Sequence, residues 1–456
     1  MIKCPNCGGE LKYNVQEKVV KCEHCGTKFN PKEKIATTKA ASEGTNLEGK
    51  VYSCSQCGAN LMTFDETAIT FCSYCGSQAM IESKMITQNN PDFIIPFEIN
   101  KEQCIETFKK KINKSIFVPN YMKSDLVVDK FRGIYIPYGV YKLGYNGPKK
   151  EKGSKYSHRS GDYEYYNDYS INFDVDAKYE GFSYDLSSKF YDRYSQAIPF
   201  DETKKLPFNP NYILGFYADA KDVEGNTYLD NAMDDAAADY KKRILSVKEM
   251  ARYGCSKPSA IKFDQIEQKT GMFPLYFLAI RSKNQKNINY AIVNGQTGKL
   301  VTELPVSYPK YIIGSLILSA IIFLLINSSL ILNPQEVCSA AIGFAIIGLI
   351  INFIQAISLS NRETHSDDEG LQSVKKDSKI KANVTSIVSI LISFISALLP
   401  VLVLAKNPAE DLYFYGAAIG SLGLVLLNFY NIIKKHNELV STKLPQLEKR
   451  GGDESA

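Results

Sequence analysis

The sequence contains no tryptophan and only four histidines among its 456 residues. His365 and His436 stand in polar stretches, and no nucleophile motif accompanies His158. A Ser–His–Asp hydrolase needs a histidine that is held between a nucleophile and an acid. The scarcity of histidine therefore argues against hydrolytic chemistry.

A phosphate-binding loop is also missing. The Walker motif G-x-x-x-x-G-K-[ST] requires Ser or Thr after the lysine, but an aliphatic residue follows both Gly-Lys pairs, at 49–50 and 298–299. The stretch Asn294–Lys299 (NGQTGK) lies between two predicted strands, so we expect a hairpin turn there. With no nucleotide site and no hydrolytic triad, the sequence predicts a protein that is not an enzyme.

The first ten residues, Met1–Glu10, contain no apolar run of the kind that a secretory signal requires. We therefore expect a protein whose thiols remain reduced in the cytosol rather than pairing as disulfides.

What the sequence does contain is cysteine in a repeated pattern. Eight of the eleven cysteines form four C-x-x-C-G knuckles in two pairs, with fourteen residues between the knuckles of each pair. The second set repeats the first at an offset of fifty residues. This spacing is typical of a four-thiolate zinc ribbon, in which a short hairpin joins the two knuckles. The ligands expected for two structural Zn²⁺ ions are Cys4, Cys7, Cys22 and Cys25 in one ribbon and Cys54, Cys57, Cys72 and Cys75 in the other.

Several alternatives to this assignment are weaker. Four repeated pairs do not resemble the single C-x-x-C of a redox enzyme. Four thiolates leave no open coordination position, which excludes a catalytic zinc. His24 lies inside a knuckle, but with four cysteines available we expect it on the surface. Each ribbon is too short to bury a core, so metal binding has to supply its folding free energy.

The C-terminal part has long stretches without charge. Four such runs begin at Tyr311, Val337, Val384 and Tyr413, and each is long enough to cross a hydrocarbon core of about 30 Å. They predict four transmembrane helices in which tyrosines supply the interface anchors. No ionisable residue lies in the middle of a run, which argues against an ion pathway.

The loops between these runs predict the orientation of the chain in the membrane. The connection after the second run carries Arg362 and four lysines, and the tail after the fourth carries Lys434, Lys435 and further basic residues. The other two loops contain a single lysine, Lys406. By the positive-inside rule, we expect a multi-pass protein of the cell membrane with both termini in the cytoplasm.

The stretch between the ribbons and the spans has mixed helical and strand patterns. Asn100 and Gln103 form a capping box before an amphipathic helix that runs to about Lys114, in which Cys104 is a core residue. A second helix is expected at 229–253. Alternating aromatic runs predict antiparallel strands at 133–145, 163–176, 273–281, 288–293 and 299–304.

The sequence therefore predicts a multidomain protein with two N-terminal zinc ribbons, an α+β cytosolic domain with an antiparallel sheet, and a C-terminal four-helix transmembrane region. The expected parts are ribbon 1 (1–30), a flexible linker (31–50), ribbon 2 (51–82), the α+β domain (92–305), the spans (311–433) and a cytoplasmic tail (434–456).

Two clusters in the α+β domain invite functional interpretations. Four aspartates between 230 and 239 could form a metal-binding face, but a solvated helix face is several times more common. Dense tyrosines from Tyr156 to Tyr194 could stack nucleobases or a peptide, although sheet packing is the commoner role.

A set of short motifs runs through the first 310 residues: FIIPF (93–97), GIYIPY (133–138), AIPF (197–200), YILGFYAD (212–219), FPLYF (273–277) and NGQTGK (294–299) continuing to Leu304-Pro305. Together they resemble a bacterial family of membrane-anchored zinc-ribbon proteins, often named TFIIB-type or related to the primosomal helicase. The resemblance implies a membrane anchor in an envelope-stress system, acting beside SPFH (flotillin-like) proteins or phage-shock protein A. The helicase name has no support here, because the phosphate loop is missing.

Two functions remain open from the residues themselves. The protein could be an adaptor that recruits or assembles a protein partner at the cytoplasmic membrane face, or it could tether DNA or RNA to the membrane through its ribbons. Phosphate binding needs several cations per module. Ribbon 1 carries five lysines against three glutamates, whereas ribbon 2 has no Lys or Arg between Val51 and Glu82. We therefore favour protein contacts.

Overall fold

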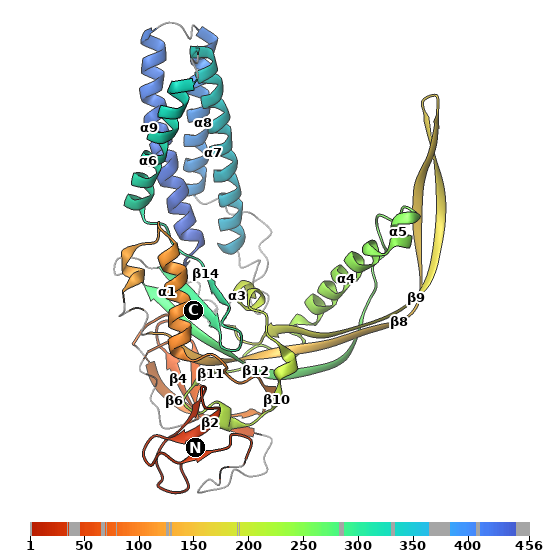
Figure 1. Ribbon diagram of the computed structural model, residues 1–456, viewed down its shortest axis with the longest axis vertical. Helices are drawn as coiled ribbons and strands as arrows, with labels where there is room; N and C mark the ends of the chain where they lie inside the picture. Colours follow the sequence, from red (N-terminus) through yellow and green to blue (C-terminus); the bar gives the residue numbers. More distant parts are fainter. Residues whose placement is uncertain are drawn as a thin grey trace.

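A large sheet lies between a small N-terminal sheet and a bundle of C-terminal helices (Figure 1). The computed structural model describes residues 2–33, 35, 46–64, 69, 71–78, 80–124, 127, 130–188, 190, 192–281, 287–329, 333–363, 384–406 and 411–443. It contains the three kinds of structure expected from the sequence: two cysteine clusters near the N-terminus, a sheet-rich domain and apolar C-terminal helices.

The small sheet belongs to the first cysteine module. The antiparallel strands β1 (Leu11–Asn14) and β2 (Val19–Cys22) form the hairpin predicted between the knuckles. Strand β3 (Lys28–Phe29) follows the second knuckle and pairs with β2. The module is docked on the large domain: the rings of Tyr13 and Tyr212 lie 5.2 Å apart, and the N–H of Tyr13 donates to the carbonyl of Leu214 at 2.9 Å.

The large sheet has twelve strands, eight of them in the order β10-β7-β12-β8-β11-β5-β4-β6. Strand β13 pairs with β12, β14 and β15, and β9 pairs with β8. The bounds are β4 (Asn46–Cys54), β5 (Asn60–Thr63), β6 (Met80–Asn89), β7 (Phe93–Ile94), β8 (Arg132–Ser160), β9 (Tyr163–Asp185), β10 (Leu206–Pro207), β11 (Tyr217–Asp219), β12 (Asp264–Arg281), β13 (Asn287–Asn294), β14 (Leu300–Thr302) and β15 (Thr442–Lys443).

Helix α1 (Lys101–Lys114) begins and ends where the sequence predicts. Asn100 accepts a hydrogen bond from the backbone of Gln103, whose side chain accepts one from the backbone of Asn100, so the predicted capping box is present. Cys104, Phe108 and Ile112 form the buried face of the helix. Short helices connect the remaining strands: η1 (Asn120–Lys123), α3 (Asp192–Ala197), η2 (Glu202–Lys204), η3 (Pro210–Tyr212) and η4 (Gly225–Tyr228).

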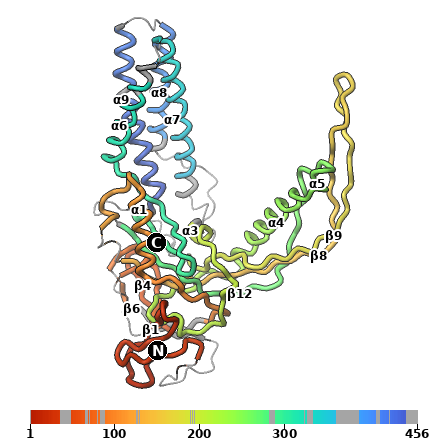
Figure 2. Tube along the Cα trace, in the orientation of Figure 1, coloured from red at the N-terminus to blue at the C-terminus, as the bar shows by residue number. Residues whose placement is uncertain are grey.

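Strands β8 and β9 continue far beyond the sheet as a two-stranded arm (Figures 1 and 2). The sequence predicts strands here but ends them at Tyr145 and Asp176, because the polar residues that follow hide the period-2 pattern. The helix predicted at 229–253 is divided into α4 (Leu229–Ser246) and α5 (Lys248–Arg252), since Val247 has an extended backbone (φ −74°, ψ 127°). Both helices lie along the arm.

Three C-terminal helices are long and apolar enough to cross a membrane: α7 (Pro334–Glu363), α8 (Val384–Lys406) and α9 (Asp411–Leu439). The predicted first span corresponds to α6 (Tyr308–Ser329). Its apolar stretch with described side chains, Tyr308–Ile322, is shorter than a span and covers only about 22 Å of a core of about 30 Å. The described residues thus contain three candidate spans rather than the four predicted.

Helix α9 extends beyond the predicted end of the last span, into residues assigned to the tail. Lys435 is 2% exposed inside the bundle, and the chain then forms β15, which pairs with β13. The basic loop that predicts the orientation, at 364–383, and the last residues of the tail lie outside the described residues.

Both described ends of the predicted linker at 31–50 contact the rest of the protein. The carbonyls of Pro31 and Glu33 accept hydrogen bonds from the Asn211 amide at 3.1 and 2.8 Å. Residues 46–50 belong to β4, because a strand partner in β6 overrides their polar composition. The middle of this segment, 36–45, lies outside the described residues.

Candidate metal centres

Each C-x-x-C-G knuckle forms the turn that its sequence predicts. The glycine N–H donates back to the carbonyl of the first cysteine, at 2.8 to 3.1 Å in the four knuckles. The glycines Gly8, Gly26, Gly58 and Gly76 have φ between 67° and 73°, a left-handed conformation that strains any residue with a Cβ. This turn directs both sulfurs of a knuckle to the same side.

The first cluster brings together Cys4, Cys7, Cys22 and Cys25. The Sγ atoms of Cys4 and Cys25 lie 3.7 Å apart, and those of Cys7 and Cys22 lie 3.5 Å apart. Cys4 and Cys22 are buried, whereas Cys7 and Cys25 are exposed. Solvent therefore reaches one side of this cluster.

The second cluster has the same geometry but a different environment. Its sulfurs approach to 3.6 Å in the pairs Cys54–Cys75 and Cys57–Cys72, and all four residues are buried. Cys54 ends strand β4, and β5 continues from the knuckle into a pairing with β11. The second cysteine module is therefore part of the large sheet, although its sequence spacing equals that of the first module, which has a small sheet of its own.

Both clusters fit a metal ion, since four ligand atoms lie within 4.8 Å of one another in each. The thiols of the second cluster cannot all ionise by themselves: the sulfur contact between Cys54 and Cys57 lowers the pKa of Cys54 and raises that of Cys57. A divalent cation would stabilise all four as thiolates. In the first cluster the Thr27 hydroxyl, 3.1 Å from the sulfur, lowers the pKa of Cys25 to about 6.

The remaining candidates from the sequence do not join these clusters. His24 is exposed and is not among the grouped ligands, as expected. Asp235 of α4 accepts a hydrogen bond from Tyr184 at 2.5 Å, and Asp239 pairs with Arg243. Cys104, Cys255 and Cys338 are buried, and in the described part of the chain they lie outside both metal-ligand groups.

A buried polar contact that sequence reasoning missed connects the second cluster to the rest of the sheet. Tyr74, between Cys72 and Cys75, donates a hydrogen bond of 2.5 Å to Asp219 at the end of β11. Ser187 also donates to this carboxylate. Burial raises the pKa of Asp219 to about 7. The YILGFYAD motif contains this aspartate, but no local pattern indicates its partner.

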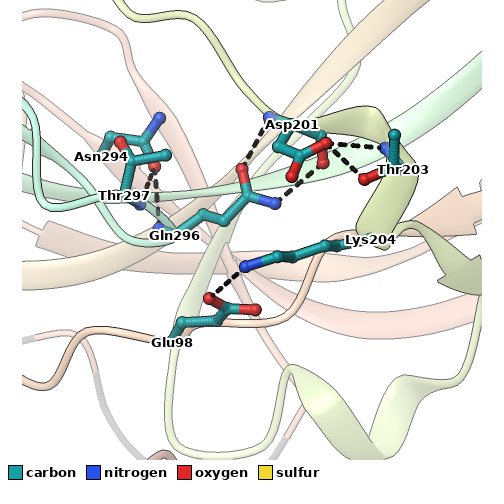
Figure 3. A network of polar contacts seen from close by, with 7 residues as sticks. All are labelled: Glu98, Asp201, Thr203, Lys204, Asn294, Gln296 and Thr297. Carbon is teal, nitrogen blue, oxygen red and sulfur yellow. Dashed lines mark hydrogen bonds and ion pairs between the residues drawn. The ribbon is translucent and has the colours of Figure 1, made fainter.

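The NGQTGK motif is a hairpin turn between β13 and β14, as predicted, and its polar side chains hold a neighbouring loop (Figure 3). Asn294 accepts hydrogen bonds from the backbone of Gln296 and Thr297 at 2.8 and 2.9 Å. The side-chain oxygen of Gln296 accepts a hydrogen bond from the N–H of Asp201, and its amide nitrogen donates one to the carbonyl of Asp201. Lys204 pairs with Glu98 at 2.9 Å next to this loop. The motif therefore has a structural role, because it holds the loop at Asp201 against the hairpin turn.

The bundle interior contains polar side chains from three helices. Asn352 of α7 donates to Ser393 of α8 at 3.0 Å, Ser393 donates to Asn428 of α9 at 2.8 Å, and Asn428 donates to Ser396 at 2.8 Å. Lys435 reaches the side-chain oxygen of Asn352 at 3.4 Å. Such bonds between helices fix their relative positions in an apolar solvent.

Comparisons with known proteins leave the family open. No family profile and no solved structure matches the chain. The chain is 27% identical over 319 residues to the uncharacterized protein YdjG of Bacillus subtilis (strain 168), an alignment that covers 68% of this chain and 91% of that protein.

Proposed function

We propose that this protein is a non-enzymatic, membrane-anchored zinc adaptor that recruits or assembles a partner protein at the cytoplasmic face of the membrane. The observation that carries the proposal is the β8–β9 arm, which leaves the sheet and ends in exposed aromatic side chains. The core of the sheet does not require this extension, because among the described residues no further strand pairs with β8 and β9 beyond Asn146. A rigid arm with an aromatic tip is suited to insertion into a protein partner.

The arm is braced at its middle and exposed at its end. The rings of Tyr169 and Tyr253 lie 5.1 Å apart, and Ser259 donates two hydrogen bonds to Glu151. Gly153 lies against the backbone of Tyr253, where a Cβ would come within 2.1 Å of the carbonyl oxygen. Beyond this brace, four tyrosines are 48% to 75% exposed: Tyr156, Tyr163, Tyr165 and Tyr166.

Charge supports a protein rather than a nucleic acid as the partner of the arm. The two-stranded extension between residues 146 and 176 has charges of both signs in nearly equal number. Its five basic residues are Lys149, Lys150, Lys152, Lys155 and Arg159, and its six acidic residues are Glu151, Asp162, Glu164, Asp168, Asp174 and Asp176. In ribbon 1, Lys12 and Lys28 pair with Glu23 and Glu17. Neither surface has the large excess of positive charge that binding to a phosphate backbone needs.

The direction of the arm supports a partner at the membrane. Arm and bundle rise from the same side of the large sheet (Figure 1). Because charged residues such as Lys152 and Asp168 lie along the arm, it cannot face lipid hydrocarbon. A membrane-associated protein beside the bundle would receive it. SPFH-type proteins and phage-shock protein A, which the sequence resemblance implies, are membrane-associated partners of this kind.

Strand pairing supports four crossings, with the large sheet and the end of α9 on the same side of the membrane. The large sheet precedes α6 and β15 follows α9, yet Ile288 of β13 pairs with Thr442 of β15. Asn437 also exchanges two hydrogen bonds with the backbone of Val306, at 2.7 and 2.9 Å. Segments that pair in one sheet lie on one side of a membrane, so the number of crossings between them is even. Crossing by α6 together with α7, α8 and α9 satisfies this condition, and three crossings do not.

Zn²⁺ is the metal that we propose for both clusters. Four thiolates in tetrahedral spacing, with no further ligand, are the ligand set of structural zinc sites. Metal analysis of the purified protein should give two zinc ions per chain.

The test is affinity purification of the full-length protein in mild detergent, with and without nuclease. We expect a stoichiometric protein partner that survives nuclease and is lost when Tyr163, Tyr165 and Tyr166 are changed to Ser. A matched control changes Ile81, Leu245 and Ile266 to Ser, which are exposed residues away from the tip. Recovery of nucleic acid, with the partner lost after nuclease, would instead support membrane tethering of DNA or RNA. Equal partner recovery from the tip variant and the control would contradict the role of the arm.

A further inference from the structure

The end of α1 lies against the first turns of α6, where the chain enters the bundle (Figures 1 and 2). The N–H of Ser307 donates to the carbonyl of Phe117 at 2.8 Å, and the rings of Phe117 and Tyr311 lie 5.4 Å apart. Lys310 donates to the carbonyl of Val118 at 2.7 Å. These contacts hold the segment after α1 at the level where the apolar helices begin.

This segment leaves a large apolar side chain uncovered. Ile116 is 74% exposed, and Phe117 is 38% exposed although its ring covers Gly314. A Cβ at Gly314 would lie 2.8 Å from that ring, so the segment is packed closely on α6. An uncovered isoleucine beside the first turns of an apolar helix is placed to meet the bilayer.

Basic residues precede and follow Ile116 along the chain. Lys110, Lys111, Lys114 and Lys123 are exposed, and in the described part of the chain none of them takes part in an ion pair. The two glutamates of α1 precede these lysines, Glu102 in the first turn and Glu106 near the middle of the helix. The end of α1 nearest the bundle is therefore cationic.

We propose that this surface, the α1 patch (Lys110, Lys111, Lys114, Ile116 and Lys123), binds the anionic phospholipid headgroups of the cytoplasmic leaflet. Lysines near an anionic surface are attracted within a Debye length, and an exposed isoleucine can enter the boundary between headgroups and acyl chains. The bilayer is the partner favoured here because the contacts with α6 keep the patch at the membrane. The inference rests on the proposed position of the large sheet at the cytoplasmic face, and it makes the patch a second attachment that fixes the tilt of the sheet.

The natural absence of tryptophan makes a direct test possible, since each Trp variant has a single reporter. Full-length Ile116→Trp is reconstituted in nanodiscs of phosphatidylcholine, with or without phosphatidylglycerol, and quenched with brominated lipids. We expect a blue-shifted emission and bromine quenching that increase with phosphatidylglycerol and decrease in high salt. Changing Lys110, Lys111 and Lys114 to Gln should remove the dependence on anionic lipid, whereas the same change at Lys241, Lys242 and Lys248 of α4 and α5 should not.

Two further reporters separate the possible failures. Phe344→Trp, on the exposed surface of α7, should be quenched in every lipid if the bundle spans the bilayer, and Ile81→Trp in β6 should not be quenched. If Phe344→Trp is quenched while Ile116→Trp behaves like Ile81→Trp, the α1 patch is overturned and the membrane anchor stands. If Phe344→Trp is not quenched, the proposed membrane position is itself wrong, and the patch with it.

Discussion

The hydroxyl of Tyr74 donates a hydrogen bond of 2.5 Å to the buried carboxylate of Asp219, 145 residues further along the chain. Because Tyr74 stands between two cysteines of the second cluster, this bond ties the metal site to strand β11 of the large sheet. The edge-to-face contact of Tyr74 with Phe277 of β12, at 5.2 Å, adds a second tie. The second cluster is therefore a structural element of the central domain and not a separate module.

Loss of the two metal sites should have unequal effects. Changing Cys54 and Cys57 to Ser removes a site buried in the core, and structural zinc contributes roughly 10 kcal/mol or more, as much as the whole stability of a domain. We expect this variant to lose protease resistance throughout the large sheet. The matched variant, Cys7→Ser with Cys25→Ser, should expose only residues near the first module. Limited proteolysis read by mass spectrometry distinguishes the two, and similar cleavage patterns would contradict the difference in burial.

Metal release should occur in two phases. Cys7 and Cys25 are exposed, so a chelator reaches the first site directly, whereas the second site opens only when the sheet does. With a coloured zinc chelator, we expect one equivalent to be released fast and one slowly. The Cys7→Ser, Cys25→Ser variant should retain the slow phase alone. A single phase of two equivalents would show that the second site is as accessible as the first.

Asp219 should make stability depend on pH. Burial raises its pKa to about 7, so between about pH 4 and pH 7 the folded state keeps a proton that the unfolded state releases. The free energy of unfolding then falls as pH rises through this window, by up to roughly 4 kcal/mol for this group alone. Asp219→Asn retains an oxygen that accepts from Tyr74 and Ser187, so we expect a flatter dependence and a higher melting temperature at pH 8. Asp234→Asn, at an exposed aspartate of α4, should keep the original slope in thermal unfolding.

The capping box should stabilise α1 measurably. Asn100→Ala removes the hydrogen bond of 2.8 Å to the backbone of Gln103 and should cost about 1 kcal/mol. Asn113→Ala, an exposed change within the same helix, should cost nothing or stabilise slightly, because alanine favours helix. Denaturant or thermal unfolding of both variants provides the comparison. Equal losses would mean that the cap contributes nothing beyond the general effect of the substitution.

Some features could be predicted from the sequence because they depend on neighbouring residues. The knuckle turns need two residues between thiolates and a glycine with positive φ, and α1 needs a cap, a box residue and an apolar residue every fourth position. The turn at NGQTGK and the apolar helices could also be predicted, because they too depend on neighbouring residues. The ligand set of both metal clusters follows directly from spacing.

Other features depend on partners that are distant along the chain. Two modules with the same cysteine spacing differ because β4 pairs with β6 and β5 pairs with β11, whereas β1, β2 and β3 form a separate sheet in the described part of the chain. The length of the arm depends on pairing between β8 and β9 in which polar residues replace the usual alternation. The pairing of β15, which follows α9, with β13 depends on how the whole helix bundle is packed. Sequence by itself determined the two groups of four cysteines, the ends of α1 and the apolar C-terminal helices, because each arises from interactions within a few residues. Only the tertiary structure decided which cluster is buried, because burial depends on strand order.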